Sequence, residues 1–168
     1  MQNDILVRKP VFEDFPTMAE IKVRGWQTAY RGIVDEAYLR KLSADQICES
    51  MRAKKKERFL VADVNGEIVG FCRYRLCEDT DVEGNCHGEI SELYVKPERK
   101  RMGIGRMLFL HVMEDLKNSG RKSVILGCFS ENHSAQAFYR RMNGIYIGSE
   151  NFEIEGRKYP VECYRFAL

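Results

Sequence analysis

Short apolar runs that alternate with polar residues recur along most of the chain and predict a series of strands. The expected strands cover residues 5–8, 59–64, 67–74, 89–95, 123–129, 145–152 and 159–166. Two of the breaks between them carry the turn dipeptides Asn65-Gly66 and Glu155-Gly156. Asn-Gly readily adopts the positive φ angles of a two-residue turn, so we expect the strands on either side of it to form a hairpin.

Apolar residues spaced three and four apart predict helices between these strands. The first helix should begin at Asp14 as its cap and end at Gly32. Its apolar side carries Met18, Ile21, Gly25, Trp26 and Ala29. Further helices are expected over 36–52, 103–119 and 132–142, and the acidic segment 78–85 is expected to be a loop. The order β-α-α-β-β-β-α-β-α-β-β predicts an α/β fold with a mixed, mostly antiparallel, twisted sheet and helices on both faces.

Composition narrows the class of protein. The chain has 168 residues, of which 44% are hydrophobic and 31% charged, as in ordinary globular domains. It shows no repeat or linker, so we expect one domain over residues 1–168. A net charge of +2 argues against nucleic acid as a partner, and no apolar run is long enough for a membrane span. Residues 1–10 lack the apolar region of a secretory signal, so we expect a cytoplasmic protein whose six cysteines stay reduced.

The segment 93–106 carries the strongest chemical signal. A strand ends there, a turn with Gly103 and Gly105 follows, and a long apolar helix begins. Glycine lets the backbone approach a ligand closely, and the unpaired N–H groups at a helix start attract anions such as phosphates. The cations of this segment, set against the single acid Glu98, are Lys96, Arg99, Lys100, Arg101 and Arg106. A tight strand-to-helix turn with solvated charges is the alternative interpretation.

The sequence resembles the GCN5-related N-acetyltransferases (GNAT) in two motifs at the appropriate separation. The first is Lys100-Arg101-Met102-Gly103-Ile104-Gly105 after Leu93-Tyr94-Val95, where Lys100 departs from the family's Arg or Gln. The second is Asn132-x-x-Ala135-x-x-Phe138-Tyr139, followed by Met142-Asn143-Gly144 in place of the usual Leu-Gly-Phe. A weaker likeness lies around Gly25-Trp26. The resemblance implies a single N-acetyltransferase domain in which the strands 89–95 and 123–129 are parallel and splay apart.

The resemblance also implies acetyl-CoA as co-substrate, bound between these two strands. The pantetheine arm would pair with the backbone of the segment Leu93-Tyr94-Val95, and Asn132 would reach the same arm. The pyrophosphate would lie on backbone N–H groups of Arg101, Met102, Gly103, Ile104, Gly105 and Arg106. Because these contacts come from the backbone, we expect the Lys100 departure to weaken phosphate affinity without abolishing it.

The expected reaction needs a base and an acid. An alkylamine has a pKa of ~10.4, so removing its proton at pH 7 costs about 4.6 kcal/mol. Glu89 matches the family's glutamate base and is the first choice, with Glu92 second; strand alternation predicts that the two lie on opposite faces. Tyr139 would protonate the departing thiolate, and a backbone N–H near Val95 would stabilise the developing oxyanion. The alternatives are solvent-facing carboxylates for the two glutamates and a core aromatic for Tyr139.

Several functional alternatives stay open. The same fold could serve as a catalytically idle acyl-CoA sensor, and the basic turn and the run 52–58 could belong to a nucleic-acid-binding module. No metal site is expected, because the cysteine spacing is not that of common zinc sites. The acceptor would be a small-molecule amine or a protein amino group. Trp26, Tyr30 and the acidic residues 78–83 are expected to line its side of the site, and the C-terminal hairpin offers an edge strand for a homodimer.

Overall fold

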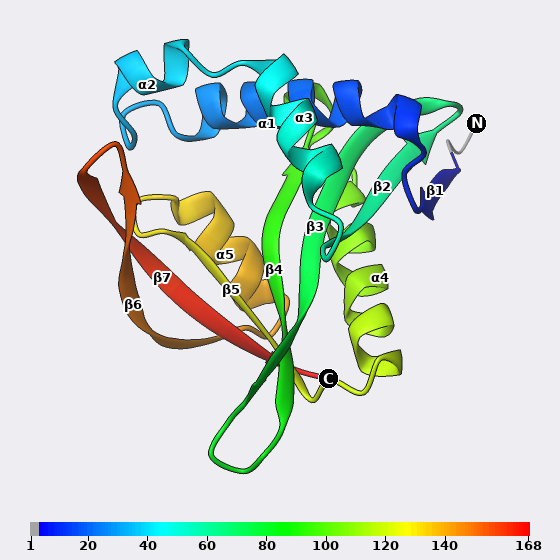
Figure 1. Ribbon diagram of the computed structural model, residues 1–168, viewed down its shortest axis with the longest axis vertical. Helices are drawn as coiled ribbons and strands as arrows, with labels where there is room; N and C mark the ends of the chain where they lie inside the picture. Colours follow the sequence, from blue (N-terminus) through cyan, green and yellow to red (C-terminus); the bar gives the residue numbers. More distant parts are fainter. Residues whose placement is uncertain (1–3) are drawn as a thin grey trace.

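The computed structural model describes residues 4–168; residues 1–3, part of the N-terminal stretch expected to lack a secretory signal, lie outside the described residues. Seven strands form one sheet in the order β1-β2-β3-β4-β5-β7-β6 (Figure 1). Their bounds are β1 Ile5–Arg8, β2 Arg58–Val64, β3 Glu67–Thr80, β4 Cys86–Val95, β5 Ser123–Phe129, β6 Ile145–Ile154 and β7 Arg157–Ala167. Every neighbouring pair is antiparallel except β4 and β5. The mixed, mostly antiparallel sheet predicted from the sequence is therefore confirmed.

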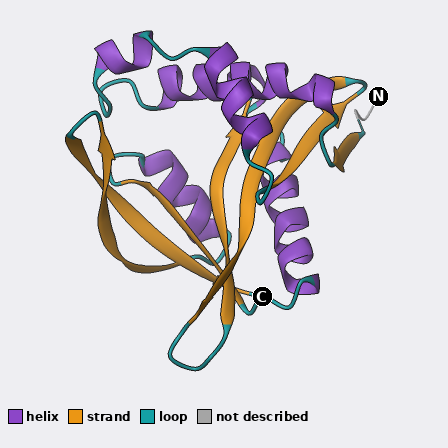
Figure 2. Ribbon diagram, viewed as in Figure 1, coloured by secondary structure: helices purple, strands orange, loops and turns teal. Residues whose placement is uncertain are grey.

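Helices cover both faces of this sheet (Figure 2). On one face lie α1 Phe15–Ala29, α2 Glu36–Arg40 and α3 Ala44–Ala53, and on the other lie α4 Ile104–Asn118 and α5 His133–Arg141. Strand alternation supplies a separate core to each face. Phe71 of β3 packs in the core beneath α1 and α3, whereas its neighbour Cys72 packs in the core beneath α4. We call these two sides the α1 face and the α4 face.

Two expectations for the N-terminal half are wrong in detail. The helix expected over 36–52 is two helices, and the second is capped by Ser43, whose Oγ accepts from the backbone N–H of Gln46 at 3.3 Å. Asp14 does precede α1, but its side chain does not cap that helix. Its carboxylate instead accepts from Arg8 at 2.7 Å and from the N–H of Val11 at 2.8 Å.

The predicted β2–β3 hairpin is confirmed, with Asn65 at φ 53° and Gly66 at φ 86°. Strand β3 runs on to Thr80, so part of the segment expected as an acidic loop is strand. The remaining loop, residues 81–85, forms the tip of the long β3–β4 hairpin, which projects at the bottom of Figure 1.

Strands β4 and β5 separate after a short paired stretch. Their parallel register covers only His87–Ile90 against Ser123–Leu126. Beyond it, β4 continues to Val95 and β5 to Phe129 without pairing to each other. The splayed parallel strand pair is therefore confirmed.

Within residues 4–168, no helix combines the length and the apolar character needed to cross a membrane.

Candidate active site

The turn from β4 to α4 presents a row of free backbone donors. Arg101 and Gly103 adopt positive φ angles of 63° and 79°, and the first hydrogen bond of the helix runs from Met107 N–H to the Gly103 carbonyl at 3.0 Å. None of the backbone N–H groups from Arg101 through Arg106 donates to an acceptor within the described chain. No side chain caps the helix, and no acid lies in its first turn. Converging N–H groups at a helix N-terminus form an anion-binding site.

Gly105 keeps the space beside this row open. A Cβ at this position would lie 3.7 Å from Val95 Cγ2 and 3.9 Å from Phe138 Cζ, which are ordinary contacts. Alanine therefore fits the fold here, but its methyl group would fill the gap between the start of α4, the end of β4 and α5. Gly103, in contrast, is required by its positive φ, which non-glycine residues rarely adopt.

Ion pairs reduce the positive charge around the turn. Glu67, in the β2–β3 hairpin, pairs with Lys96 and Arg99, each at 2.8 Å, and Glu98 pairs with Arg24 at 2.8 Å. The remaining cations of the turn have no ion-pair partner among residues 4–168: Lys100, Arg101 and Arg106. The sequence predicted five cations against one acid, and it missed Glu67 because that residue enters from another hairpin.

The separation of β4 from β5 exposes a strand edge. Residues 92–95 of β4 pair with β3 along one edge, and their other edge faces the splay with no partner strand among residues 4–168. The side chains of Leu93 and Val95 pack on the α4 face. Tyr94 lies on the α1 face, against Gly25 of α1. An open edge of this kind can accept an extended amide-containing ligand as an additional strand.

Helix α5 brings two candidate residues to the same splay. The Asn132 Oδ1 caps the helix by accepting from the Ala135 N–H at 3.2 Å, and its Nδ2 donates to no acceptor within residues 4–168. The Tyr139 ring packs against Tyr164 and Phe166. Its hydroxyl makes no hydrogen bond within the described residues, and burial raises its pKa well above the ordinary value.

Asn143-Gly144 reverses the chain at the end of α5. Asn143 adopts φ 68°, and the Gly144 N–H donates to the Tyr139 carbonyl at 2.9 Å. A Cβ on Gly144 would lie 2.7 Å from the Phe166 ring, so only glycine fits. This close packing fixes the end of α5 against β7 and with it the position of Tyr139.

Glu89 and Glu92 lie on the same face, so the prediction of opposite faces is wrong. Register pairs Arg73 with Glu92 but Tyr74 with Ile90, which leaves Ser91 as a bulge. The bulge adds one residue to β4 and turns both carboxylates towards the α1 face, opposite Arg73 and Arg75 of β3.

The two carboxylates have different partners. Glu89 Oε2 accepts from Arg75 Nη2 at 2.6 Å and Nε at 3.1 Å, and its Oε1 has no partner within residues 4–168. Glu92 is buried, and both of its oxygens are used: Oε1 contacts Lys22 Nζ, and Oε2 accepts from Arg73 Nε at 3.0 Å. Lys22 and Arg73 lie far from Glu92 in the sequence and could not be identified as its partners, since only the fold brings them together.

Aromatic rings gather at the α1 side of the splay. Tyr30 lies edge-on to Trp26 and to Phe129, with centroid separations of 4.9 and 4.8 Å. The Trp26 Nε1 donates to the Tyr94 hydroxyl at 2.7 Å, and burial raises the pKa of Tyr30. Trp26 and Tyr30 thus lie beside the open end of β5.

The acidic segment is not part of this cluster. Residues 81–85 form the loop that precedes β4 at the tip of its hairpin, at the opposite end of that strand from Val95 (Figure 1). The expectation that residues 78–83 join Trp26 and Tyr30 at one site is therefore wrong. The length of β3 explains the error, because six further residues of strand carry the turn away from α1.

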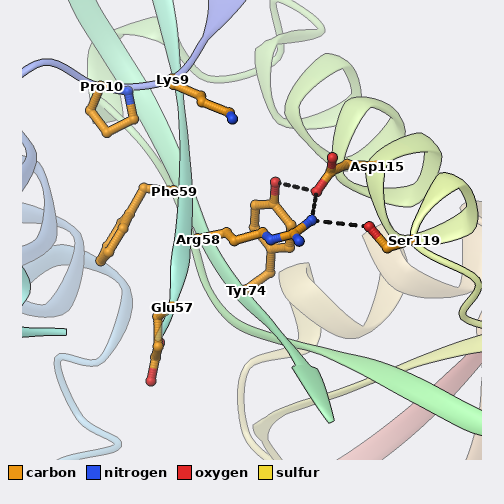
Figure 3. Close-up of a pocket in the computed structure, with 8 residues that line it drawn as sticks. All are labelled: Lys9, Pro10, Glu57, Arg58, Phe59, Tyr74, Asp115 and Ser119. Carbon is orange, nitrogen blue, oxygen red and sulfur yellow. Dashed lines mark hydrogen bonds and ion pairs between the residues drawn. The ribbon is translucent and has the colours of Figure 1, made fainter. Parts of the chain in front are cut away.

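A pocket of about 570 Å³ lies elsewhere, at the C-terminal end of α4 (Figure 3). In it, Asp115 accepts from Arg58 at 2.7 Å and from the Tyr74 hydroxyl at 2.8 Å, and the Ser119 Oγ accepts from Arg58 at 3.0 Å. These contacts hold α4 against β2 and β3. The anion-binding turn lies at the other end of the same helix, so this pocket is separate from the candidate site.

Known proteins match the chain over most of its length. The acetyltransferase (GNAT) family matches residues 19–145. An uncharacterized N-acetyltransferase of Bacillus subtilis, YuaI, is 29% identical over 153 residues, covering 90% of this chain and 87% of that protein. A spermidine N(1)-acetyltransferase of Thermoplasma acidophilum is 25% identical over 151 residues, covering 85% and 89%.

Solved structures share the fold. The PaiA N-acetyltransferase of Thermoplasma acidophilum, solved in complex with coenzyme A, superposes with a TM-score of 0.70 at 23% identity and covers 95% of this chain and 98% of that one. The family match covers residues 19–145, which include both motifs. The superposition shows that the shared fold also includes strands β6 and β7. The chain belongs to the GNAT family of acetyltransferases.

Proposed function

We propose that this enzyme transfers the acetyl group of acetyl-CoA to a primary amine that approaches from the α1 face. The observation that carries the proposal is a juxtaposition: the free N–H groups of residues 101–106 lie directly after the open edge of β4. Anionic and amide portions of one ligand can therefore be bound in sequence along the chain. The candidate base Glu89 and the aromatic residues Trp26 and Tyr30 lie on the α1 face of the sheet, opposite the face that α4 covers.

The residues present fit acetyl-CoA in charge and shape. The pyrophosphate would accept from the N–H groups of residues 101–106, with the unpaired cations Lys100, Arg101 and Arg106 around it. The pantetheine amides would pair with the backbone of Leu93, Tyr94 and Val95 and with the free Nδ2 of Asn132. Gly105 leaves room for this arm between Val95 and Phe138.

The co-substrate supplies an activated acetyl group, and the chain must deprotonate the amine. Glu89 is our candidate base, because its Oε1 is free and its residue lies one pair before β4 and β5 separate. Glu92 is less available, since Lys22 and Arg73 hold both of its oxygens. A backbone N–H of β4 near Val95 would stabilise the negative charge that develops on the thioester oxygen.

Tyr139 would act on the departing sulfur. Burial raises its pKa, so the phenol stays protonated at every working pH and is always a hydrogen-bond donor. A thiol has an ordinary pKa of ~8.5, so complete proton transfer from this phenol to a thiolate is uphill. We therefore infer that the Tyr139 hydroxyl donates a hydrogen bond to the sulfur as negative charge develops there. Tyr139 passes its proton to the sulfur only as it receives a proton from the amine.

The acceptor is proposed as a small-molecule amine or a protein amino group. The spermidine N(1)-acetyltransferase among the relatives favours a cationic amine. The acidic segment 78–83 no longer supports that choice, because it lies at the far tip of its hairpin. The half-buried rings of Trp26 and Tyr30 instead offer aromatic surface on which an alkylammonium group can lie.

Calorimetric titration with acetyl-CoA, followed by an amine panel, tests the proposal. We expect one-to-one micromolar binding, and release of free thiol only when a primary amine is present. The panel should compare spermidine, a lysine-containing peptide, and neutral or acidic amino compounds. Binding without transfer to any amine would indicate an acyl-CoA sensor. Absence of binding up to millimolar acetyl-CoA would refute the proposal.

Strand β6 lies at one edge of the sheet. The edge strand β6 exposes Ile145, Tyr146, Ile147 and Phe152, so we propose that two copies pair along it. Sedimentation of the protein and of an Ile147→Lys variant tests this; a monomeric parent protein would refute it.

We also propose a cytoplasmic location, where reducing conditions keep the six cysteine thiols free, and cell fractionation is the test.

A further inference from the structure

One lysine of the chain holds the position expected of an acceptor amine. The Lys22 Nζ, from α1, contacts the Glu92 Oε1. Glu92 is the β4 residue immediately before Leu93, and the bulge at Ser91 turns its carboxylate to the α1 face. An alkylammonium group is thus already bound by the first residue of the open strand edge, on the side from which the acceptor is proposed to arrive.

The carboxylate that binds this ammonium is itself firmly placed. The Glu92 Oε2 accepts from Arg73 Nε at 3.0 Å, and Arg73 in turn pairs with Glu57 at 2.6 Å. The Glu92 side chain is 5% exposed, whereas that of Lys22 is 22% exposed. Of the two cations on Glu92, Arg73 is also held by Glu57, whereas Lys22 has a flexible four-carbon stem and no second ion-pair partner among residues 4–168, so Lys22 is the partner that can move.

We propose that Lys22 is an internal acceptor, and that its Nζ becomes acetylated by bound acetyl-CoA when no competing amine is present. This proposal rests on the proposed function. Outside amines would compete with Lys22 for the acetyl group of bound acetyl-CoA, so the modification would occur mainly in acceptor-starved enzyme.

The step balances in atoms and protons. The Lys22 ammonium gives one proton to the Glu92 Oε1, which it already contacts, and from there the proton passes to solvent. The Nζ then forms a bond to the carbonyl carbon, and the carbon–sulfur bond breaks. The sulfur takes a proton from Tyr139, and Tyr139 is reprotonated by the second proton that the nitrogen loses. The products are an uncharged acetyl-lysine at position 22 and free coenzyme A.

A purely structural ion pair makes a different prediction. Spontaneous acetylation by acetyl-CoA follows exposure, and the Lys41 side chain, paired with Glu155, is 58% exposed. If Lys22 is only a structural partner of Glu92, it should react more slowly than Lys41. If it is an internal acceptor, it should react first despite being more buried.

The experiment incubates the full chain with acetyl-CoA alone and measures acetyl occupancy at Lys22 and Lys41 by peptide mass spectrometry. We expect occupancy at Lys22 to exceed that at Lys41 by at least about tenfold, because a positioned amine reacts at a higher effective concentration. Addition of a turned-over amine should suppress the modification. Lys22→Arg keeps a cation for Glu92 and should abolish it, and Lys41→Arg is the matched control that should not.

A second readout does not depend on activity. Acetylation removes one of the two cations on buried Glu92, so after removal of acetyl-CoA the modified protein should melt roughly 5 °C or more below the unmodified protein. Lys22→Arg treated in the same way should show no such fall. A similar fall in the Lys22→Arg variant would overturn the assignment to Lys22.

The outcomes separate this proposal from the proposed function. Transfer to outside amines, with Lys22 modified no faster than Lys41, would overturn the internal acceptor and leave the proposed function standing. Failure of transfer both to outside amines and to Lys22 would overturn both proposals.

Discussion

Substitution of Gly105 by alanine should strengthen the fold and weaken the cofactor site at the same time. Gly105 occupies the second position of α4 and has ordinary helical space around it, since a Cβ would approach no atom closer than 3.7 Å. Alanine in a helix is more favourable than glycine by about 0.5–1 kcal/mol, because less backbone entropy is lost on folding. For a chain of this size the melting temperature should rise by about 1–4 °C.

Binding of acetyl-CoA should move in the other direction. The added methyl group would fill the gap between Val95 and Phe138, beside the free N–H groups of residues 104–106. Loss of one hydrogen bond to a charged phosphate costs about 1.5–3 kcal/mol, which corresponds to a roughly 10- to 150-fold weaker Kd.

Two assays on the same Gly105→Ala sample test this reasoning. Calorimetry should report the weaker Kd, and a thermal melt without ligand should report the higher melting temperature. The exposed residue Glu114, on the same helix, provides the control Glu114→Ala, which should leave both quantities nearly unchanged. A Gly105→Ala protein that binds acetyl-CoA as tightly as its parent would refute the role given to this turn.

Three further predictions concern other parts of the molecule. Tyr139→Phe should lower kcat by about 10²- to 10⁴-fold with little change in the calorimetric Kd of acetyl-CoA, and full turnover would show that this phenol is only a core residue. Gly144→Ala should lower the free energy of unfolding by about 1–3 kcal/mol in urea denaturation, because its Cβ would lie 2.7 Å from the Phe166 ring; an unchanged midpoint would contradict the packing described. The pKa of Asp14 is lowered by Arg8, so Asp14→Asn should cost about 1.5–3 kcal/mol at pH 7. That cost should shrink as the pH falls below the ordinary carboxyl value of about 3.9 and vanish below the lowered pKa of Asp14; a constant difference across this range would exclude the ion pair as its source.

Local chemistry made much of the fold predictable. The turn at Asn65-Gly66 and the uninterrupted apolar strand Ser123–Phe129 depend on residues next to each other in the chain, and both were found as predicted. The break between α2 and α3 is also local. Its signal is Ser43, three residues before Gln46, which caps a new helix even though the apolar spacing continues through the break.

The site was less predictable because it depends on register. The bulge at Ser91 changes the face of every β4 residue on one side of it, and nothing in the order of residues 89–95 signals it. The same is true of the ion pairs around Glu92, whose partners Lys22 and Arg73 come from α1 and β3. The candidate cofactor-binding residues and Tyr139 could be read from two motifs, and Glu89 from its match to the family's base, but their availability for chemistry could not.

The short parallel pairing of β4 with β5 leaves two parts of the sheet joined by few backbone hydrogen bonds. Strands β1–β4 and strands β5–β7 are two half-sheets, and the backbone ladder that joins them consists of the four residue pairs from His87–Ser123 to Ile90–Leu126. A ligand that forms hydrogen bonds with the open edges of both β4 and β5, beyond Ile90 and Leu126, would extend the ladder and join the two half-sheets more firmly. Amide hydrogen exchange along β4 and β5 should then slow far from any atom that touches the ligand. If acetyl-CoA binds in this way, the loaded enzyme will be stiffer than the free enzyme, because the ligand's hydrogen bonds would add to those that join the two half-sheets.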